Sequence, residues 1–231
     1  MGFSRLDGYD MPSLSVEFYD IEHMESLGQS IERESTKLSI IPEDEIPLCG
    51  KTIPTSNGGI AVLSNPYLNR DYYRDMAKYV QTKLLTTSID FVIKNNGRVL
   101  ATDVRVECEI DKSQSIQLVY DVHNMPTEPR KSAIDELIPL RFPSHDNHNI
   151  KVKETQACWK IQASLGKIQP QSISATSSGL YLGARESTEL KLKIRLFADN
   201  LPVPHEQELL IRARIIERTI TVEEFMETLQ K

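Results

Sequence analysis

The chain has 231 residues, 39% of them hydrophobic and 26% charged, which is long enough for a large folded core and excludes a disordered chain. Its 27 basic and 33 acidic residues give a net charge of −6, which excludes the overall positive charge that drives nonspecific nucleic-acid binding. Three widely spaced cysteines, Cys49, Cys108 and Cys158, exclude a dense disulfide framework, so we expect reduced structural thiols.

Targeting and catalytic motifs are absent from the sequence. It contains no run of about 18 apolar residues, and its first residues lack the apolar centre of a signal peptide, so we expect a cytoplasmic protein without a membrane span. Gly2 follows Met1, but Leu6 stands where a myristoylation motif requires Ser or Thr. Because no phosphate-binding glycine loop, nucleophile elbow or zinc-protease motif occurs, we expect neither an enzyme nor a cofactor.

The N-terminal part predicts one short strand followed by irregular chain. Leu14, Val16 and Phe18 alternate with polar residues, as in a strand with one buried face. The polar residues 22–37 predict mostly loop, and residues 38–41 a second strand. Prolines and glycines punctuate residues 41–59, so this segment is expected to cross the surface, where it could cover a sheet edge.

A helix is predicted over residues 69–84. Its apolar residues fall on one stripe at helical spacing: Tyr72, Met76, Tyr79, Val80 and Leu84. Tyr72 and Tyr73 allow a ligand-stacking interpretation, but aromatic residues on a helix stripe more often pack in a core.

Residues 89–110 predict two half-buried strands joined by a tight turn, that is, a β-hairpin. In the second strand apolar and charged residues alternate, with Val104, Val106, Cys108 and Ile110 on the buried face. Asn95, Asn96 and Gly97 tolerate positive φ at a turn, and the length of the connection favours a bulge or a looser loop. Residues 115–122 are expected to pair antiparallel with the strand that starts at Asp103.

A long proline-rich excursion follows, from His123 to Asn149, in which only residues 137–140 suggest a strand. We expect variable or functional surface here. His145 and His148, with Asp146 between them, could contribute to a metal site only with a ligand from elsewhere, because the prolines argue against a helix. Solvated loop histidines are the simpler interpretation, and we expect no metal.

The C-terminal half carries the strongest strand signals. Trp159, Ile161 and Ala163 share the predicted inner face of one strand. Residues 189–200 and 209–215 predict a hairpin, which would place five cations on one exposed face: Lys191, Lys193, Arg195, Arg212 and Arg214. This basic patch has two interpretations, a surface that contacts a phosphate backbone or an acidic partner, or a solvated outer face.

A helix over residues 222–230 closes the chain. Thr221 and Glu224 form a capping box, and Ile220 and Phe225 stand where a hydrophobic staple needs them. A helix this short is stabilised by docking, so it packs either on its own domain or, by exchange, on a second protomer.

Several segments, taken in order, resemble a known family. They are SLSVEFYD, NRDYYRDMAKYV, IDFVIKNNGRVLATDVRVECEI, MPTEP, WKIQASLGKIQP, LYLGARESTELKLKIRLFADNLPVP and ITVEEF. Together they are similar to the immunoglobulin-like β-sandwich accessory region that follows the ATP-binding domain in prokaryotic Schlafen-like, AlbA-type proteins. The resemblance implies an accessory module in a regulatory or defence-related protein, with the chemistry in another domain, and the start DGYDMPSLSVEF reads like an entry from a preceding domain.

The expected fold is mainly β: an immunoglobulin-like antiparallel β-sandwich of seven to nine strands with one flanking helix and a short C-terminal helix. Residues 1–85 would supply a strand, an irregular segment and a helix that pack on the sandwich of residues 86–231. The expected function is noncatalytic protein interaction or assembly, with a protein partner, a fused effector domain or a second copy. The alternative is a nucleic-acid-binding module that uses the basic face.

Overall fold

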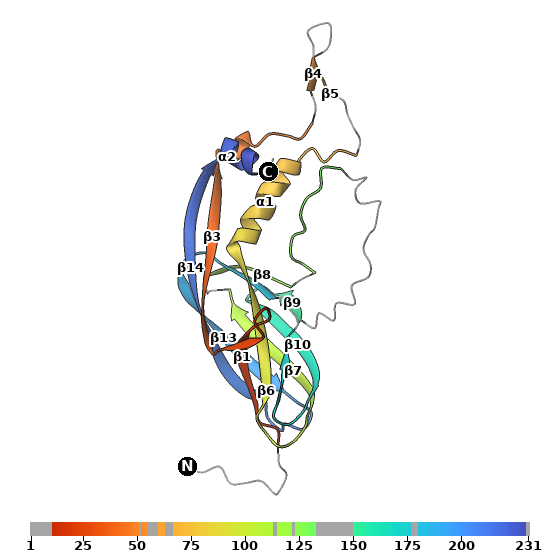
Figure 1. Cartoon of the computed structure of the whole chain (residues 1–231), viewed down its shortest axis with the longest axis vertical. Coiled ribbons are helices and arrows are strands. Elements are labelled where there is room, and N and C mark those ends of the chain that lie inside the picture. Colours follow the sequence, from red (N-terminus) through yellow and green to blue (C-terminus); the bar gives the residue numbers. More distant parts are fainter. Residues whose placement is uncertain are drawn as a thin grey trace. The chain divides into compact units, whose positions relative to one another are not determined.

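The computed structural model describes residues 11–50, 52–54, 60–62, 67–112, 115–121, 123–132, 150–176 and 180–229. Figure 1 shows the elements. They are β1 (Leu14–Asp20), β2 (Glu25–Gly28), β3 (Ser30–Ile41), the 3₁₀ turn η1 (Glu43–Glu45), β4 (Thr52–Pro54), β5 (Ile60–Val62), α1 (Tyr72–Leu85), β6 (Thr86–Asn95), β7 (Ala101–Asp111), β8 (Ile116–Tyr120), β9 (Ile150–Glu154), β10 (Cys158–Ile168), β11 (Ser172–Ala175), β12 (Leu180–Ala184), β13 (Thr188–Phe197), β14 (His205–Thr221) and α2 (Val222–Thr228).

The chain forms two compact units that are each discontinuous in sequence. The first contains Met1–Ser35, Thr86–Met125 and Asn147–Ile215, and the second contains Thr36–Leu85, Pro126–Asp146 and Ile216–Lys231. This division differs from a single cut after residue 85, because β1 pairs with β6 inside the first unit.

The first unit is a sandwich of two sheets. One sheet has the strand order β2-β1-β6-β12-β8, with β11 also paired to β6, and the other has the order β3-β14-β13-β7-β10-β9. Buried side chains from both sheets form one core, in which Val16, Phe18 and Phe91 come from the first sheet and Trp159 and Leu192 from the second. The predicted immunoglobulin-like β-sandwich is thus confirmed, with six described strands in each sheet, twelve in all, instead of seven to nine.

The strands β3 and β14 run parallel, an exception to the antiparallel fold predicted. Ion pairs join Glu32 to Arg212, and Glu34 to Arg214. A step of two residues along β3, from Glu32 to Glu34, matches a step of two residues in the same direction along β14, from Arg212 to Arg214. The two strands therefore run in the same direction. The prediction of mostly loop over residues 22–37 is therefore wrong, since β2 and most of β3 lie there.

The predicted hairpin over residues 89–110 is also wrong. Both strands exist, but β6 pairs with β1, β11 and β12 in one sheet, whereas β7 pairs with β10 and β13 in the other. The connection between them therefore crosses from sheet to sheet. Likewise β8 pairs with β12 and not with β7, so the pairing expected of residues 115–122 is wrong.

The crossing depends on Asn95 and Gly97 for reasons other than positive φ, which neither residue adopts. Asn95 is 1% exposed, and its amide nitrogen donates to the carbonyls of Val99 (2.7 Å) and Ile168 (3.2 Å). Its side-chain oxygen accepts from the N–H of Gly97. A Cβ at Gly97 would lie 2.7 Å from the backbone nitrogen of Ser13, so the neighbouring chain leaves room only for glycine.

Both helices belong to the second unit, which has its own apolar core: Leu38, Ile40, Ile46, Met76, Ala77, Val222 and Phe225. The predicted stripe of α1 is correct at Met76 but not at Leu84, which is 41% exposed, while Leu85 is buried. Tyr72 and Tyr73 pack against this core, as the packing interpretation expected. The helix α2 docks on its own chain through Val222 and Phe225.

The capping box of α2 is present as predicted. The backbone N–H of Glu224 donates to the Thr221 hydroxyl, and the backbone N–H of Thr221 donates to the Glu224 carboxylate at 2.9 Å. Two other predictions, the strand at residues 137–140 and the histidine pair at 145 and 148, lie outside the described residues.

Candidate functional site

The outer face of the second sheet is a charged surface of the first unit. It is built by strand alternation: in β13, for example, Leu192 and Ile194 point into the core, so Lys193 and Arg195 point outward. The predicted β13–β14 hairpin is confirmed, with Lys193 opposite Glu208 and Arg195 opposite Glu206. We call this surface the charged face and define it by two rows of residues.

Each row crosses five strands, in the order β14, β13, β7, β10 and β9, and is fixed by the strand registers. The first row is Glu208, Lys193, Glu109, Lys160 and Lys153; the second row is Glu206, Arg195, Glu107, Gln162 and Lys151. Across the first four strands, the signs alternate from acidic to basic in both rows, except that Gln162 is neutral.

The five predicted cations do share the outer face, but the face is not a basic patch. Ion pairs join Lys191 to Glu208 (3.6 Å), Arg195 to Glu107 (3.0 Å), Arg212 to Glu189 (3.1 Å) and Arg214 to Glu34 (3.5 Å). These carboxylates come from four strands: Glu208 from β14, Glu107 from β7, Glu189 from β13 and Glu34 from β3. The hairpin prediction did not include β7 or β3. A phosphate backbone would meet acidic and basic groups side by side, so the nucleic-acid alternative loses its electrostatic basis. Contact of these cations with a protein partner stays a prediction.

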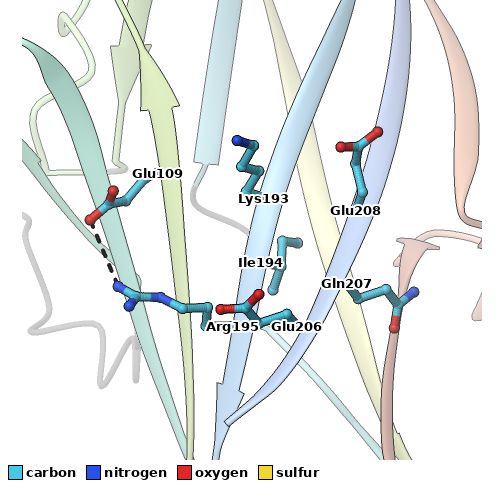
Figure 2. A pocket seen from close by; sticks show the side chains of 7 residues that line it. All are labelled: Glu109, Lys193, Ile194, Arg195, Glu206, Gln207 and Glu208. Carbon is cyan, nitrogen blue, oxygen red and sulfur yellow. Dashed lines mark ion pairs between the residues drawn. The ribbon is translucent and has the colours of Figure 1, made fainter. Parts of the chain in front are cut away.

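Lys193 stands out among the five cations, because no ion pair of its ammonium group occurs among the described residues. It lies at an open depression of about 490 Å³, lined by Glu109, Lys193, Ile194, Arg195, Glu206, Gln207 and Glu208. Figure 2 shows Lys193 between the acidic side chains of β7 and β14, and the ion pair between Arg195 and Glu109 (3.8 Å). The depression can therefore receive groups of either charge.

Two side chains close the edges of the sandwich. The side-chain oxygen of Gln207 on β14 accepts from the N–H of Val16 on β1 (3.1 Å), and its nitrogen donates to the Val16 carbonyl (2.6 Å). On the other side, Asp121 is 5% exposed and accepts from the N–H of Val152 on β9 (3.1 Å). Sequence reasoning missed both residues, because neither belongs to a local motif.

One carboxylate of the first sheet is poorly solvated. One oxygen of Asp90 is buried without a hydrogen-bond partner among the described residues. Burial raises the pKa of Asp90 to about 6, which the nearby Arg33 partly opposes and Asp20 reinforces. A hydrogen bond of 2.9 Å joins Asp20 to the exposed His23, and it lowers the pKa of Asp20 and raises that of His23.

The thiols are free, as the sequence predicted, but differ in burial. Cys108 is 2% exposed, and burial raises the pKa of its thiol to about 12, whereas Cys49 and Cys158 are half-buried. Within the described ranges, no group of three or more His, Cys, Asp or Glu residues is placed to hold a metal ion. None of the helices described is both long enough and apolar enough to cross a membrane.

Comparison with known proteins gives no family. No family model and no curated protein matches the chain. Among solved structures, a PapD-like domain of human CEP192 is 9% identical over 94% of this chain and 98% of that one, with a TM-score of 0.32. A collagen-binding domain from a Staphylococcus aureus adhesin is 12% identical over 55% of this chain and 95% of that one, with a TM-score of 0.26. A family 123 glycoside hydrolase from Clostridium perfringens is 11% identical over 89% of this chain and 28% of that one, with a TM-score of 0.31. Likenesses this distant carry no argument about function.

Proposed function

We propose that this chain is a noncatalytic module for protein interaction or assembly, and that the charged face is its contact surface. The observation that carries the proposal is the pair of alternating charged rows across β14, β13, β7 and β10. Charges arranged with alternating sign favour a partner with the complementary order and disfavour others, because like charges placed opposite each other are costly.

The surroundings of the charged face support a rigid recognition surface. Each row lies on hydrogen-bonded strands whose inward neighbours are buried, such as Ile194 and Cys108, so its side chains start from fixed positions. Pre-positioned groups lose less conformational freedom on binding. The depression at Lys193 adds a recess into which a partner side chain fits.

The resemblance to the accessory region of Schlafen-like proteins is part of this proposal. On that view the module acts in the cytoplasm, beside an ATP-binding effector domain that it docks or regulates. The support is the order of the seven sequence segments. The proposal assigns no catalytic residue and no cofactor to this chain.

The experiment that tests the proposal compares the wild-type chain with Lys193→Glu. Solution mass is measured across protein concentration, and binding partners are identified by cross-linking in an extract of the native cells. We expect self-association or one specific partner in the wild type, weakened about tenfold or more by the substitution. A chain that is monomeric and binds nothing, or whose binding ignores this substitution, would refute the proposal.

A further inference from the structure

We infer that the partner of the charged face is a second copy of the same chain, bound face to face about a two-fold axis. The axis runs parallel to the strands, midway between β13 and β7. This inference rests on the proposed function and specifies its partner. It follows from the order of charges in the two rows, which is complementary to itself under that rotation.

The rotation exchanges neighbouring strands and keeps each residue at its own level along them. It therefore places β13 over β7 of the second copy, and β14 over β10. In the first row Lys193 meets Glu109 of the second copy, and Glu208 meets Lys160. In the second row Arg195 meets Glu107, while Glu206 meets the amide of Gln162, which can donate a hydrogen bond.

The position of the axis is specific. An axis shifted by half a strand spacing, so that it lies along β13, would place Lys193 over Lys193 and Glu109 over Glu208. Like charges would then face each other where β13 lies over β13 and where β14 lies over β7, which repels the two copies. Of these two axes, only the one between β13 and β7 gives opposite or neutral partners along the four central strands.

The second copy would supply an ion-pair partner for the ammonium group of Lys193. Lys193 has no ion pair among the described residues, and the dimer places it over the carboxylate of Glu109, which within its own chain pairs with Lys160 (3.2 Å) and Arg195 (3.8 Å). Exposed ion pairs are individually weak, so several together produce a weak dimer that depends on salt. Raising the ionic strength from about 0.1 M to 1 M shortens the Debye length from about 10 Å to 3 Å, and we expect the dissociation constant to rise about tenfold or more.

Two single variants of the full chain test the geometry. In Lys193→Glu, positions 193 and 109 are both acidic, and in Glu109→Lys they are both basic. Neither variant can pair with itself, but a mixture of the two places acidic over basic at both contacts. Sedimentation at low salt should therefore show that each variant alone is a monomer and that the equimolar mixture is a heterodimer.

Matched variants keep the test decisive. Lys78→Glu makes the same charge change at an exposed position of α1 and should leave the dimer intact. Circular dichroism and thermal unfolding establish that each variant is folded; if either Glu109→Lys or Lys193→Glu is not, Arg195→Glu and Glu107→Lys form the equivalent pair in the second row.

The outcomes separate this inference from the proposed function. A wild-type chain that stays monomeric, or a mixture of variants that stays monomeric, overturns the two-fold dimer. If a different protein then binds the wild type and not Lys193→Glu, the proposed function stands without self-association. A wild-type dimer that Lys193→Glu leaves unchanged overturns both, because the charged face is then not the contact.

Discussion

The side-chain amide of Gln207 forms two hydrogen bonds with the main chain of Val16, to its N–H at 3.1 Å and its carbonyl at 2.6 Å. The two residues lie in different sheets. Since β2 pairs with β1 only at Phe18, Tyr19 and Asp20, the side chain takes the place that a strand's peptide group would occupy beside Val16. One residue thus links the sheets at this edge of the sandwich.

Replacing Gln207 with Ala should lower the free energy of unfolding by about 1–3 kcal/mol. The substitution leaves the N–H and the carbonyl of Val16 without partners in a part-buried position. Urea denaturation measures the change. Gln162→Ala is the matched control, because it removes a hydrogen bond from an exposed side chain to Glu107 and should cost less than about 0.5 kcal/mol.

Replacing Gly97 with Ala should destabilise the first unit by about 1–3 kcal/mol, because the new Cβ lies 2.7 Å from the backbone nitrogen of Ser13 and the backbone must shift. Gly50→Ala is the control, since its Cβ would meet only Leu68, at an ordinary 3.9 Å. Chemical denaturation measures the free energy of unfolding of both variants and of the wild type. Equal stability of the two would mean that the crossing from β6 to β7 does not pack against β1 as described.

The stability of the chain should depend on pH through Asp90. Its pKa is raised from 3.8 to about 6 in the folded state, so the folded chain holds this proton more tightly than the unfolded one. Stability due to Asp90 is therefore full below about pH 4, falls as the pH rises towards 6, and is lost above it.

Asp90→Asn removes this dependence. Because the side chain is only half-buried, screening limits the effect to about 1 kcal/mol between pH 4 and pH 7. Denaturation at several pH values should show a smaller decline in the variant than in the wild type. The exposed Asp44→Asn is the control and should keep the wild-type profile. A wild-type profile in Asp90→Asn would exclude Asp90 as the group responsible.

Thiol labelling should separate the three cysteines. Cys108 is buried and its raised pKa keeps the thiol protonated, so in the native chain it should react at least about a hundredfold more slowly than Cys49 or Cys158. Mass spectrometry after timed alkylation assigns each site. In denaturant the three rates should converge; fast native labelling of Cys108 would mean that the core at β7 opens readily.

The alternation of apolar and polar residues in the sequence predicted which face of each strand is buried, but not which strands pair with each other. The inward residues of β10 and the outward cations of β13 and β14 were predicted correctly. So was the β13–β14 hairpin, because a short connection joins two long alternating strands. The same pattern gave a wrong prediction at β6 and β7, which were expected to pair as a hairpin. Consecutive strands alternate in the same way whether they pair in one sheet or face each other across the core, so alternation cannot distinguish the two.

The rest depends on contacts between residues distant in sequence. The polar segment of β3 resembles a loop in the sequence. Its acidic residues form ion pairs with Arg212 and Arg214 of β14, some 180 residues later, which the sequence pattern does not show. The charged face likewise requires the registers of β7, β10 and β13 together. The sequence placed five cations on one face, but it did not show that the strand carrying Glu107 and Glu109 lies beside them.

The two edge contacts, Gln207 with Val16 and Asp121 with Val152, also bear on how this chain behaves when crowded. Fibrils and strand-swapped aggregates grow by adding backbone to the unpaired N–H and C=O groups of an outer strand. At β1 and β9 a side chain of the same molecule already occupies such groups. Removing either contact should shorten the lag time of aggregation even where most molecules remain folded, so these residues protect solubility as well as stability.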